Sequence, residues 1–522
     1  MTSDRGAHRR TGTAVLLLLV GSGCMVGPNY VRPATPVAAT WLEAGEAAVR
    51  ATPADGLRWW AAFGDPTLTR LVETAYAQNL TLRTAGVRVL EAQARRAIAI
   101  GGLFPQTQEV TGAYTRTLLS ANGVIPPFFG RGFDNWQAGF DASWELDLWG
   151  KLRRGVEAAD ADLLGAVAGY DDVLVSLLAE VATTYVGVRV DDERLAVARD
   201  NVRAQRDGLR IARVRWEAGG TSELDVQQAT TLLRDTQATI PALEIERRRA
   251  VDSLCVLLGG PPQDLGELLG GPGHVPEVPA TVTVGIPAEL LRRRPDVRSA
   301  ELAAAAQSAR IGVAVADLLP AFELTGSVGL SAQDAAKFFE GRSFQAMAGP
   351  TFTWPVLNYG RLVGNVRLQD ATFHELALAY ASAVLLAQQE VEDALVGYLR
   401  GTARVRRLTE SVAAADRAVE LALVQYREGA TDYTAVLNAQ QAKLKEEDLL
   451  ASTRGSVALS VIALYKALGG GWEIRDGHDF VPAALRAGGP RAAARGAAAV
   501  ARAAADERPR RWWQWRWWWP EW

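Results

Sequence analysis

The chain has 522 residues, and 56 Lys and Arg stand against 59 Asp and Glu, which gives a net charge of −3. This balance argues against a nucleic-acid partner, which would favour a strongly basic face. The two cysteines, Cys24 and Cys255, do not have the spacing of a metal knuckle and do not predict a disulfide framework.

The N-terminus has the pattern of an export signal. Arg9 and Arg10 precede the apolar run AVLLLLV and a few small residues, and the run is too short to anchor the chain in a bilayer. The stretch VGSGC resembles a bacterial lipobox, so residues 1–23 are expected to be removed and Cys24 to be lipidated. An ordinary signal peptide with an incidental cysteine is the alternative. No later run of about 18 apolar residues occurs, so no transmembrane helix is expected.

Four segments alternate between apolar and polar residues and are therefore predicted to be β-strands. They span residues 109–117, 135–147, 322–331 and 344–356, and turn-rich loops join them in pairs. Alternation with aromatic ends is typical of transmembrane strands, and a half-buried soluble sheet is the alternative. Lipid does not tolerate the open edges of a four-stranded sheet, so several chains would have to share one barrel. Two chains would give eight strands and three would give twelve, and the spacing does not choose between them.

A heptad repeat follows each predicted pair of strands. Apolar residues recur every seven positions from Leu174 to Trp216 and again from Val384 to Tyr426. Such a pattern predicts long helices that supercoil against neighbours. A continuous helix from about Leu148 to Arg215 would be roughly 100 Å long, beyond the reach of an ordinary compact domain.

Each long helix ends in a similar glycine corner, RVRWEAGGTSELDVQQA at 213–229 and LVQYREGATDYTAVLNA at 423–439. Tyr426 lies 210 positions after Trp216, and Gly429 lies 210 positions after Gly219. A second helix follows each corner, at about 222–258 and 432–468, and ends in glycines. The chain therefore reads as two copies of one unit, each with an antiparallel helical hairpin.

Several longer motifs carry a family resemblance. CMVGPNYVRP, GLFPQ, WELDLWGKLRRG, IPAELLRRRPDVRSAE and LYKALGGGWE stand in family order. With the segment WWAAFGDPTLTRLVETAYAQNLTLRTA, they resemble the TolC-like outer-membrane factor family, and especially its NodT/OprM-like lipoprotein branch.

The resemblance implies a mainly α fold with a small β part. Long antiparallel coiled-coil hairpins, repeated twice, would form an α-barrel, and four transmembrane strands would join a shared trimeric β-barrel. It also implies an outer-membrane channel subunit of a tripartite efflux system in a Gram-negative bacterium. The expected partners are two further copies, a periplasmic adaptor (a membrane fusion protein), an inner-membrane pump of the resistance-nodulation-division class and outer-membrane lipid. No cofactor is expected beyond the lipid on Cys24.

The resemblance places the two glycine corners at the periplasmic tip, where an adaptor docks. The docking residues are then Trp216, Gly219, Gly220, Tyr426 and Gly429.

A gate lies behind the tip in this family. The gate region comprises Asp225, Tyr433, Thr434, Asn438 and Gln441. Relatives usually have a leucine, an aspartate and an arginine at the last three positions. We expect their replacement to give a closed gate that is looser or less cation-selective, held by Tyr426 or Tyr433.

The predicted organisation has eight segments. They are a lipoprotein signal peptide (1–23), a lipidated N-terminal segment with the first equatorial helices (24–106), β-hairpin 1 (107–147), helical hairpin 1 (148–270), an interrepeat linker and helix (271–320), β-hairpin 2 (321–357), helical hairpin 2 (358–472) and an Ala/Arg/Trp-rich tail (473–522).

No catalytic constellation is present in the sequence, so the chain is not expected to be an enzyme. His374-Glu375 lacks the second histidine of a zinc-protease motif and is expected on a helix surface. The alternatives to efflux are an outlet for protein secretion on the same fold and a non-conducting coiled-coil lipoprotein scaffold. The tail ends in RRWWQWRWWWPEW, which is either a dispensable extension or a segment that binds a membrane surface.

Overall fold

A computed structural model describes residues 25–50, 52, 58–120, 122, 131–289 and 293–482. Cys24, the signal segment and the tail from residue 483 therefore lie outside the described residues. The chain divides into two units, residues 1–474 and 475–522, and the architecture below belongs to the first. The predicted mainly helical fold with a small β part is confirmed.

The main elements follow one another in a simple order. They are α2 (Pro66–Gln78), α3 (Leu80–Gly101), β2 (Thr107–Leu118), β3 (Gly132–Leu146), α4 (Lys151–Glu217), α5 (Glu223–Leu257), α8 (Pro295–Ala316), β5 (Ala321–Ala332), β6 (Phe344–Thr353), α9 (Arg361–Arg427) and α10 (Tyr433–Ala467). Two short strands, β1 (Val49–Arg50) and β4 (Val282–Thr283), pair in parallel beside them.

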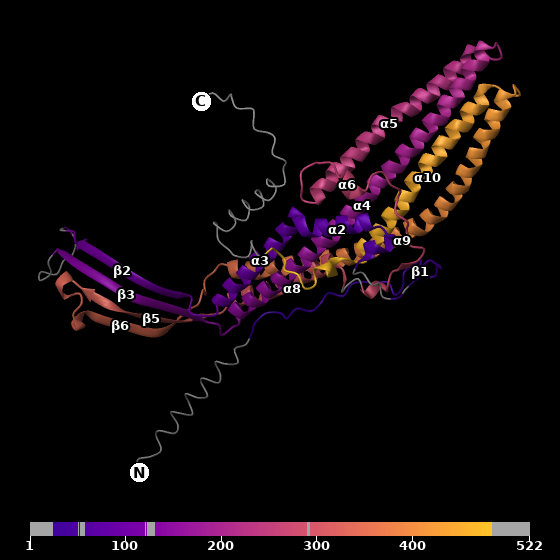
Figure 1. Cartoon of the computed structure of the whole chain (residues 1–522). Helices are drawn as coiled ribbons and strands as arrows, with labels where there is room; N and C mark the ends of the chain where they lie inside the picture. The colour runs from indigo at the N-terminus through magenta and orange to yellow at the C-terminus, as the bar shows by residue number, and fades with distance from the viewer. Residues whose placement is uncertain are drawn as a thin grey trace, which may run out of the picture. The chain divides into compact units, whose positions relative to one another are not determined.

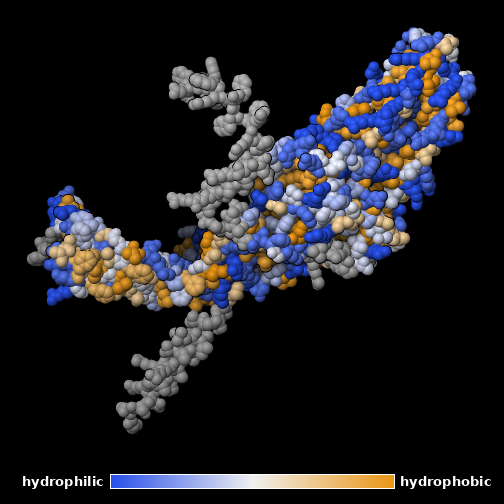
Figure 2. Space-filling model, in the orientation of Figure 1, coloured by the Kyte–Doolittle hydropathy of each residue, from blue (hydrophilic) through white to orange (hydrophobic). Residues whose placement is uncertain are grey.

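The four longer strands form one antiparallel sheet in the order β2-β3-β5-β6. The register puts most of the large apolar residues of the four strands on one face, while Phe133 and Met347 lie on the other. Phe140, for example, lies between Val110 of β2 and Val328 of β5. This face is open in the single chain, since Val110 is 86% exposed and Phe344 is 59% exposed, and Figure 2 shows apolar residues gathered over the strands. The other face carries mainly Thr, Ser, Gln, Asp and Glu.

The two helical hairpins have matching lengths. Helices α4 and α9 have 67 residues each, and α5 and α10 have 35 residues each. At 1.5 Å per residue, α4 and α9 are each roughly 100 Å long. The four helices run side by side, and α4 and α10 bring the two hairpins together (Figure 1).

The predicted apolar seam is buried over most of its length. In α4 it is covered from Leu174, which is 0% exposed, to Leu209, which is 8% exposed. The exposure of the last heptad position differs between the two hairpins, since Trp216 is 45% exposed whereas Tyr426 is 1% exposed. Packing against neighbouring helices, rather than helix propensity alone, therefore stabilises these long helices.

One described helix, Lys151–Glu217, is long and apolar enough to cross a membrane by length and composition. The sequence predicts no transmembrane helix, and 61% of the apolar window of this helix is buried within the structure.

Residues 25–42, called the N-terminal strap below, form hydrogen bonds with α4 and α9. The Val26 N–H donates to the Trp149 carbonyl at 3.0 Å. Arg154 of α4 is 2% exposed and donates to the Val26 carbonyl and to the Asn29 side chain, at 3.2 Å and 2.8 Å. Further along, the Ala38 N–H donates to Gln388 of α9 at 2.8 Å. The strap thus fixes the first described residues at the start of α4.

Candidate gate at the hairpin tips

Both hairpin tips use the same backbone turn. Gly219 and Gly429 have φ of +73° and +77°, a left-handed conformation that strains other residues. The next residue in each turn reaches back five positions, with Gly220 N–H donating to Arg215 O at 2.7 Å and Ala430 N–H to Gln425 O at 2.9 Å. These bonds satisfy carbonyls left free at the helix ends. The turn chemistry explains why each long helix ends where a glycine follows.

Arg215 connects the two tips. Its guanidinium donates to the Gly220 carbonyl in its own tip at 3.1 Å and to the Arg427 carbonyl in the other tip at 3.2 Å. It also lies over the Tyr426 ring, with its central carbon 4.7 Å from the ring centroid. A cation is favoured at both places, because helix C-termini carry partial negative charge and the ring face is electron-rich.

Asp225 of α5 holds the same tyrosine from the other side. The Tyr426 hydroxyl donates to Asp225 at 3.1 Å, and the Thr221 hydroxyl also donates to that carboxylate. Asp225 is 6% exposed, so these donors compensate for the burial of its charge. We call Arg215, Tyr426 and Asp225 the clasp, since together they join hairpin 1 to hairpin 2 at the tips.

Tyr433 lies directly behind the clasp. Its ring meets the Tyr426 ring edge-on, with centroids 5.2 Å apart, and it is 1% exposed. Burial, helped by the nearby Tyr426 and Asp225, raises the pKa of Tyr433 to about 12, and burial also raises the pKa of Tyr426. Both hydroxyls therefore stay protonated at neutral pH.

The predicted gate residues divide into two groups. Asp225 and Tyr433 are buried at the contact between the hairpins, whereas Thr434, Asn438 and Gln441 form an exposed stripe along α10. Positions spaced by four and three residues lie on one helix face, so this stripe is a single surface. Of the predicted docking residues, Trp216, Gly219, Gly220 and Gly429 are exposed and Tyr426 is buried.

Sequence reasoning missed two features of this region. Arg215 was missed because its partners are backbone carbonyls, which leave no signal in the sequence. Gln205 and Gln440, at the contact between α4 and α10, were missed because helical spacing does not distinguish a buried amide from a surface one. Both side chains are at most 2% exposed, and their amide groups have no hydrogen-bond partner among the described residues.

The described residues offer little for metal or nucleophilic chemistry. No group of three or more His, Cys, Asp or Glu side chains that could hold a metal ion occurs within residues 25–482, leaving out the gaps given above. Cys255 is buried as a free thiol, and His374 lies on the surface of α9 with a 70% exposed side chain.

Comparison with known proteins gives consistent matches across most of the chain. The family described as outer membrane efflux protein matches residues 71–260 and 286–470. Nodulation protein T of Rhizobium leguminosarum bv. trifolii is 31% identical over 461 residues, which cover 88% of this chain and 97% of that protein. The pyoverdine export outer membrane protein OpmQ of Pseudomonas putida is 33% identical over 422 residues, or 80% of this chain and 88% of that one.

A solved structure agrees with these matches. The outer-membrane channel OprN superposes with a TM-score of 0.81 at 32% sequence identity, over 86% of this chain and 100% of that chain.

The buried tyrosine predicts a pH dependence of stability. An exposed tyrosine loses its proton near pH 10, whereas Tyr433 keeps its proton to about pH 12. Between these values the unfolded chain binds fewer protons, so stability falls as the pH rises, by at most about 1.4 kcal/mol per pH unit for this group. Tyr433→Phe has no such proton to lose. Its urea-unfolding midpoint should therefore fall less steeply between about pH 10 and 12 than that of the wild type.

Tyr359→Phe is the matched control, because Tyr359 is 98% exposed. Its pH profile should follow the wild type. Equal slopes for wild type and Tyr433→Phe would contradict the assignment.

Proposed function

Because the chain belongs to the outer membrane efflux protein family, we propose that three copies form one conduit across the outer membrane and the periplasm. The chain is an outer-membrane component of an efflux system. The conduit would be passive and carry small molecules, with the energy supplied by a pump in the inner membrane. The observation that carries the proposal is the sheet, since one face is apolar and open while the other is polar.

The edges of this sheet favour assembly. Within the described chain, β2 and β6 each have one neighbouring strand, so one side of each exposes unpaired backbone groups. Hydrocarbon offers no hydrogen-bond partner for such groups, and closing a barrel removes both edges. Membrane barrels have at least about eight strands, so two or more chains are needed. The family resemblance supports three chains and twelve strands.

Small molecules are supported as cargo over secreted proteins. OpmQ, which matches 80% of this chain, is named for the export of pyoverdine. A non-conducting scaffold has less support, because it would not require a sheet with an open apolar face. The proposed partners are a periplasmic adaptor at the two tips and an inner-membrane pump of the resistance-nodulation-division class.

The clasp is proposed to hold the periplasmic end closed. It joins α4 and α5 to α9 within one chain through a buried hydrogen bond from Tyr426 to Asp225, one hydrogen bond from Arg215 to the Arg427 carbonyl and a cation–ring contact. Separation of the hairpins would have to break all of them. We therefore propose Tyr426 as the lock, one of the two tyrosines that the sequence analysis names for this role.

The ring beside the clasp is proposed to be uncharged. Thr434, Asn438 and Gln441 form the exposed stripe of α10, and none of them carries a charge. A neutral ring attracts cations less than a carboxylate ring does. Divalent cations should therefore bind weakly at this level of the conduit.

Lipidation of Cys24 is proposed at the start of the strap. The adjoining residues are held firmly, because Val26 bonds to Trp149 and Arg154 binds the Val26 carbonyl. These contacts lie just after β3, where the apolar sheet ends. A lipid attached there would reach the same membrane as the sheet.

Purified wild-type protein should form ion channels in planar bilayers. Removing the Tyr426 hydroxyl or the Arg215 guanidinium should raise the open probability about tenfold, because a lost buried hydrogen bond costs about 1–3 kcal/mol. Single-channel recording of Tyr426→Phe and Arg215→Ala tests this. Arg213→Ala, which removes an exposed arginine on the same helix, is the control and should behave as wild type. An absence of channels would refute the conduit. Unchanged gating in both variants would refute only the clasp.

Asn438→Asp should give the channel sensitivity to divalent cations. The substitution would place one carboxylate per chain at the neutral ring, and carboxylates bind Mg²⁺ and Ca²⁺. Millimolar Mg²⁺ should reduce the current of Asn438→Asp while leaving wild type and Gln93→Glu, an exposed change on α3, unaffected. A wild-type channel that Mg²⁺ already blocks at this concentration would show that the ring is not the neutral element we describe.

Cys24→Ser should abolish incorporation of radiolabelled palmitate in cells. The contacts given above for the strap are made by residues 26–38, which the variant keeps, so it should still fold and its tryptic pattern should match that of the wild type. Labelling of the serine variant would place the lipid elsewhere.

A further inference from the structure

We propose that the groove between α5 and α10 is a binding site for hydrophobic organic cations in the wall of the conduit. The inference rests on the proposed function and deepens it by naming a substrate class. The groove has a volume of about 700 Å³, which lies within the ~300–1,000 Å³ range of small-molecule sites.

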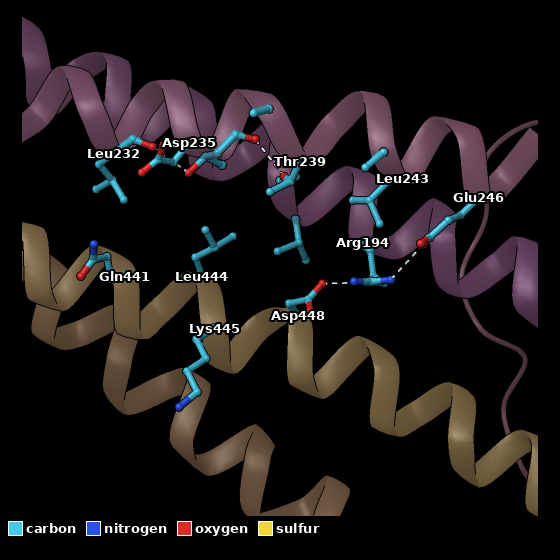
Figure 3. Close-up of a pocket in the computed structure, with 15 residues that line it drawn as sticks. Arg194, Leu232, Asp235, Thr239, Leu243, Glu246, Gln441, Leu444, Lys445 and Asp448 are labelled. Atoms are coloured by element: carbon cyan, nitrogen blue, oxygen red, sulfur yellow. Dashed lines mark hydrogen bonds and ion pairs between the residues drawn. The ribbon is translucent and has the colours of Figure 1, made fainter.

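The lining of the groove is largely apolar. Leu232 and Leu243 reach in from α5 and Leu444 faces them from α10 (Figure 3). Val197 and Ala198 of α4 also line the groove. Leucine and alanine side chains at this spacing favour a flat apolar body over a strongly hydrated ion.

Arg194, which forms ion pairs with two carboxylates, closes one end of the groove. Arg194 of α4 lies 2.7 Å from Asp448 of α10 and 3.5 Å from Glu246 of α5 (Figure 3). Its charge is matched by two carboxylates, so it is a poor partner for an anionic ligand. The same two contacts bridge α5 and α10 and keep the groove at a fixed width.

The remaining charges favour a cation. Asp235 lines the groove, is exposed, and has no ion-pair partner among the described residues. Lys445 is the only other cation in the lining, and its ammonium group extends away from the groove in Figure 3. Three carboxylates therefore face one arginine, and the excess negative charge complements a ligand with one positive charge.

The groove opens on the same helix face as the proposed gate ring. Gln441 belongs to the exposed stripe with Thr434 and Asn438 and also lines the groove, and Leu444 and Asp448 continue that stripe. If the ring faces the conduit, the groove faces it as well. A cation held there would sit just beyond the gate, on its way out.

Binding of ethidium, a fluorescent hydrophobic cation, to the purified full-length protein tests the site. Thr239→Trp should fill the groove from the exposed side of α5 and weaken ethidium binding more than tenfold. Asp235→Asn should weaken it about fivefold, as expected for one partly exposed charge pair worth about 1 kcal/mol. Fluorescein, an anion of similar size, should bind at least tenfold more weakly than ethidium.

Two matched variants separate the site from general effects. Thr84→Trp adds the same ring on α3, and Glu420→Gln removes an exposed carboxylate from α9. Both should bind ethidium as the wild type does. Wild-type affinity in Thr239→Trp, or equal binding of fluorescein, would overturn the proposal. Bilayer currents without ethidium binding would refute this inference alone, whereas an absence of currents would refute the conduit itself.

Discussion

The apolar seam of the long helices is the constraint on which the rest of the structure depends. A helix of 67 residues has no compact core of its own, so α4 and α9 depend on the burial of most of their heptad positions against neighbouring helices. Corresponding residues of the two halves occupy the same heptad position, because their offset of 210 residues is a whole number of heptads. The hairpins can therefore pack side by side and bring their tips to the same level.

The two tips share a backbone but not their side chains. Arg215 and Asp225 belong to the first hairpin, and the matching positions in the second hold Gln425 and Ala435. The second tip contributes Tyr426, whose counterpart Trp216 is turned to solvent. The two halves therefore share one backbone turn, and the three side-chain positions that differ between them build the contact between the tips.

Much of this arrangement follows from the sequence, and what does not has a physical reason. Heptads, alternation and corner glycines are local signals, so the bounds of α4 and β5 fall within a few residues of those predicted. Polar residues interrupt the alternation in the first strand, predicted at 109–117, and its pairing with β3 extends it to Thr107–Leu118. Contacts between hairpins are different. The clasp and the buried amides of Gln205 and Gln440 depend on how two surfaces meet, which no local pattern encodes.

The clasp is complete within one chain, because its contacts join Arg215, Asp225 and Tyr426 of the same protomer. A trimer of this chain would therefore carry three clasps around its periplasmic end. Full opening of that end would require the hairpins of all three protomers to part.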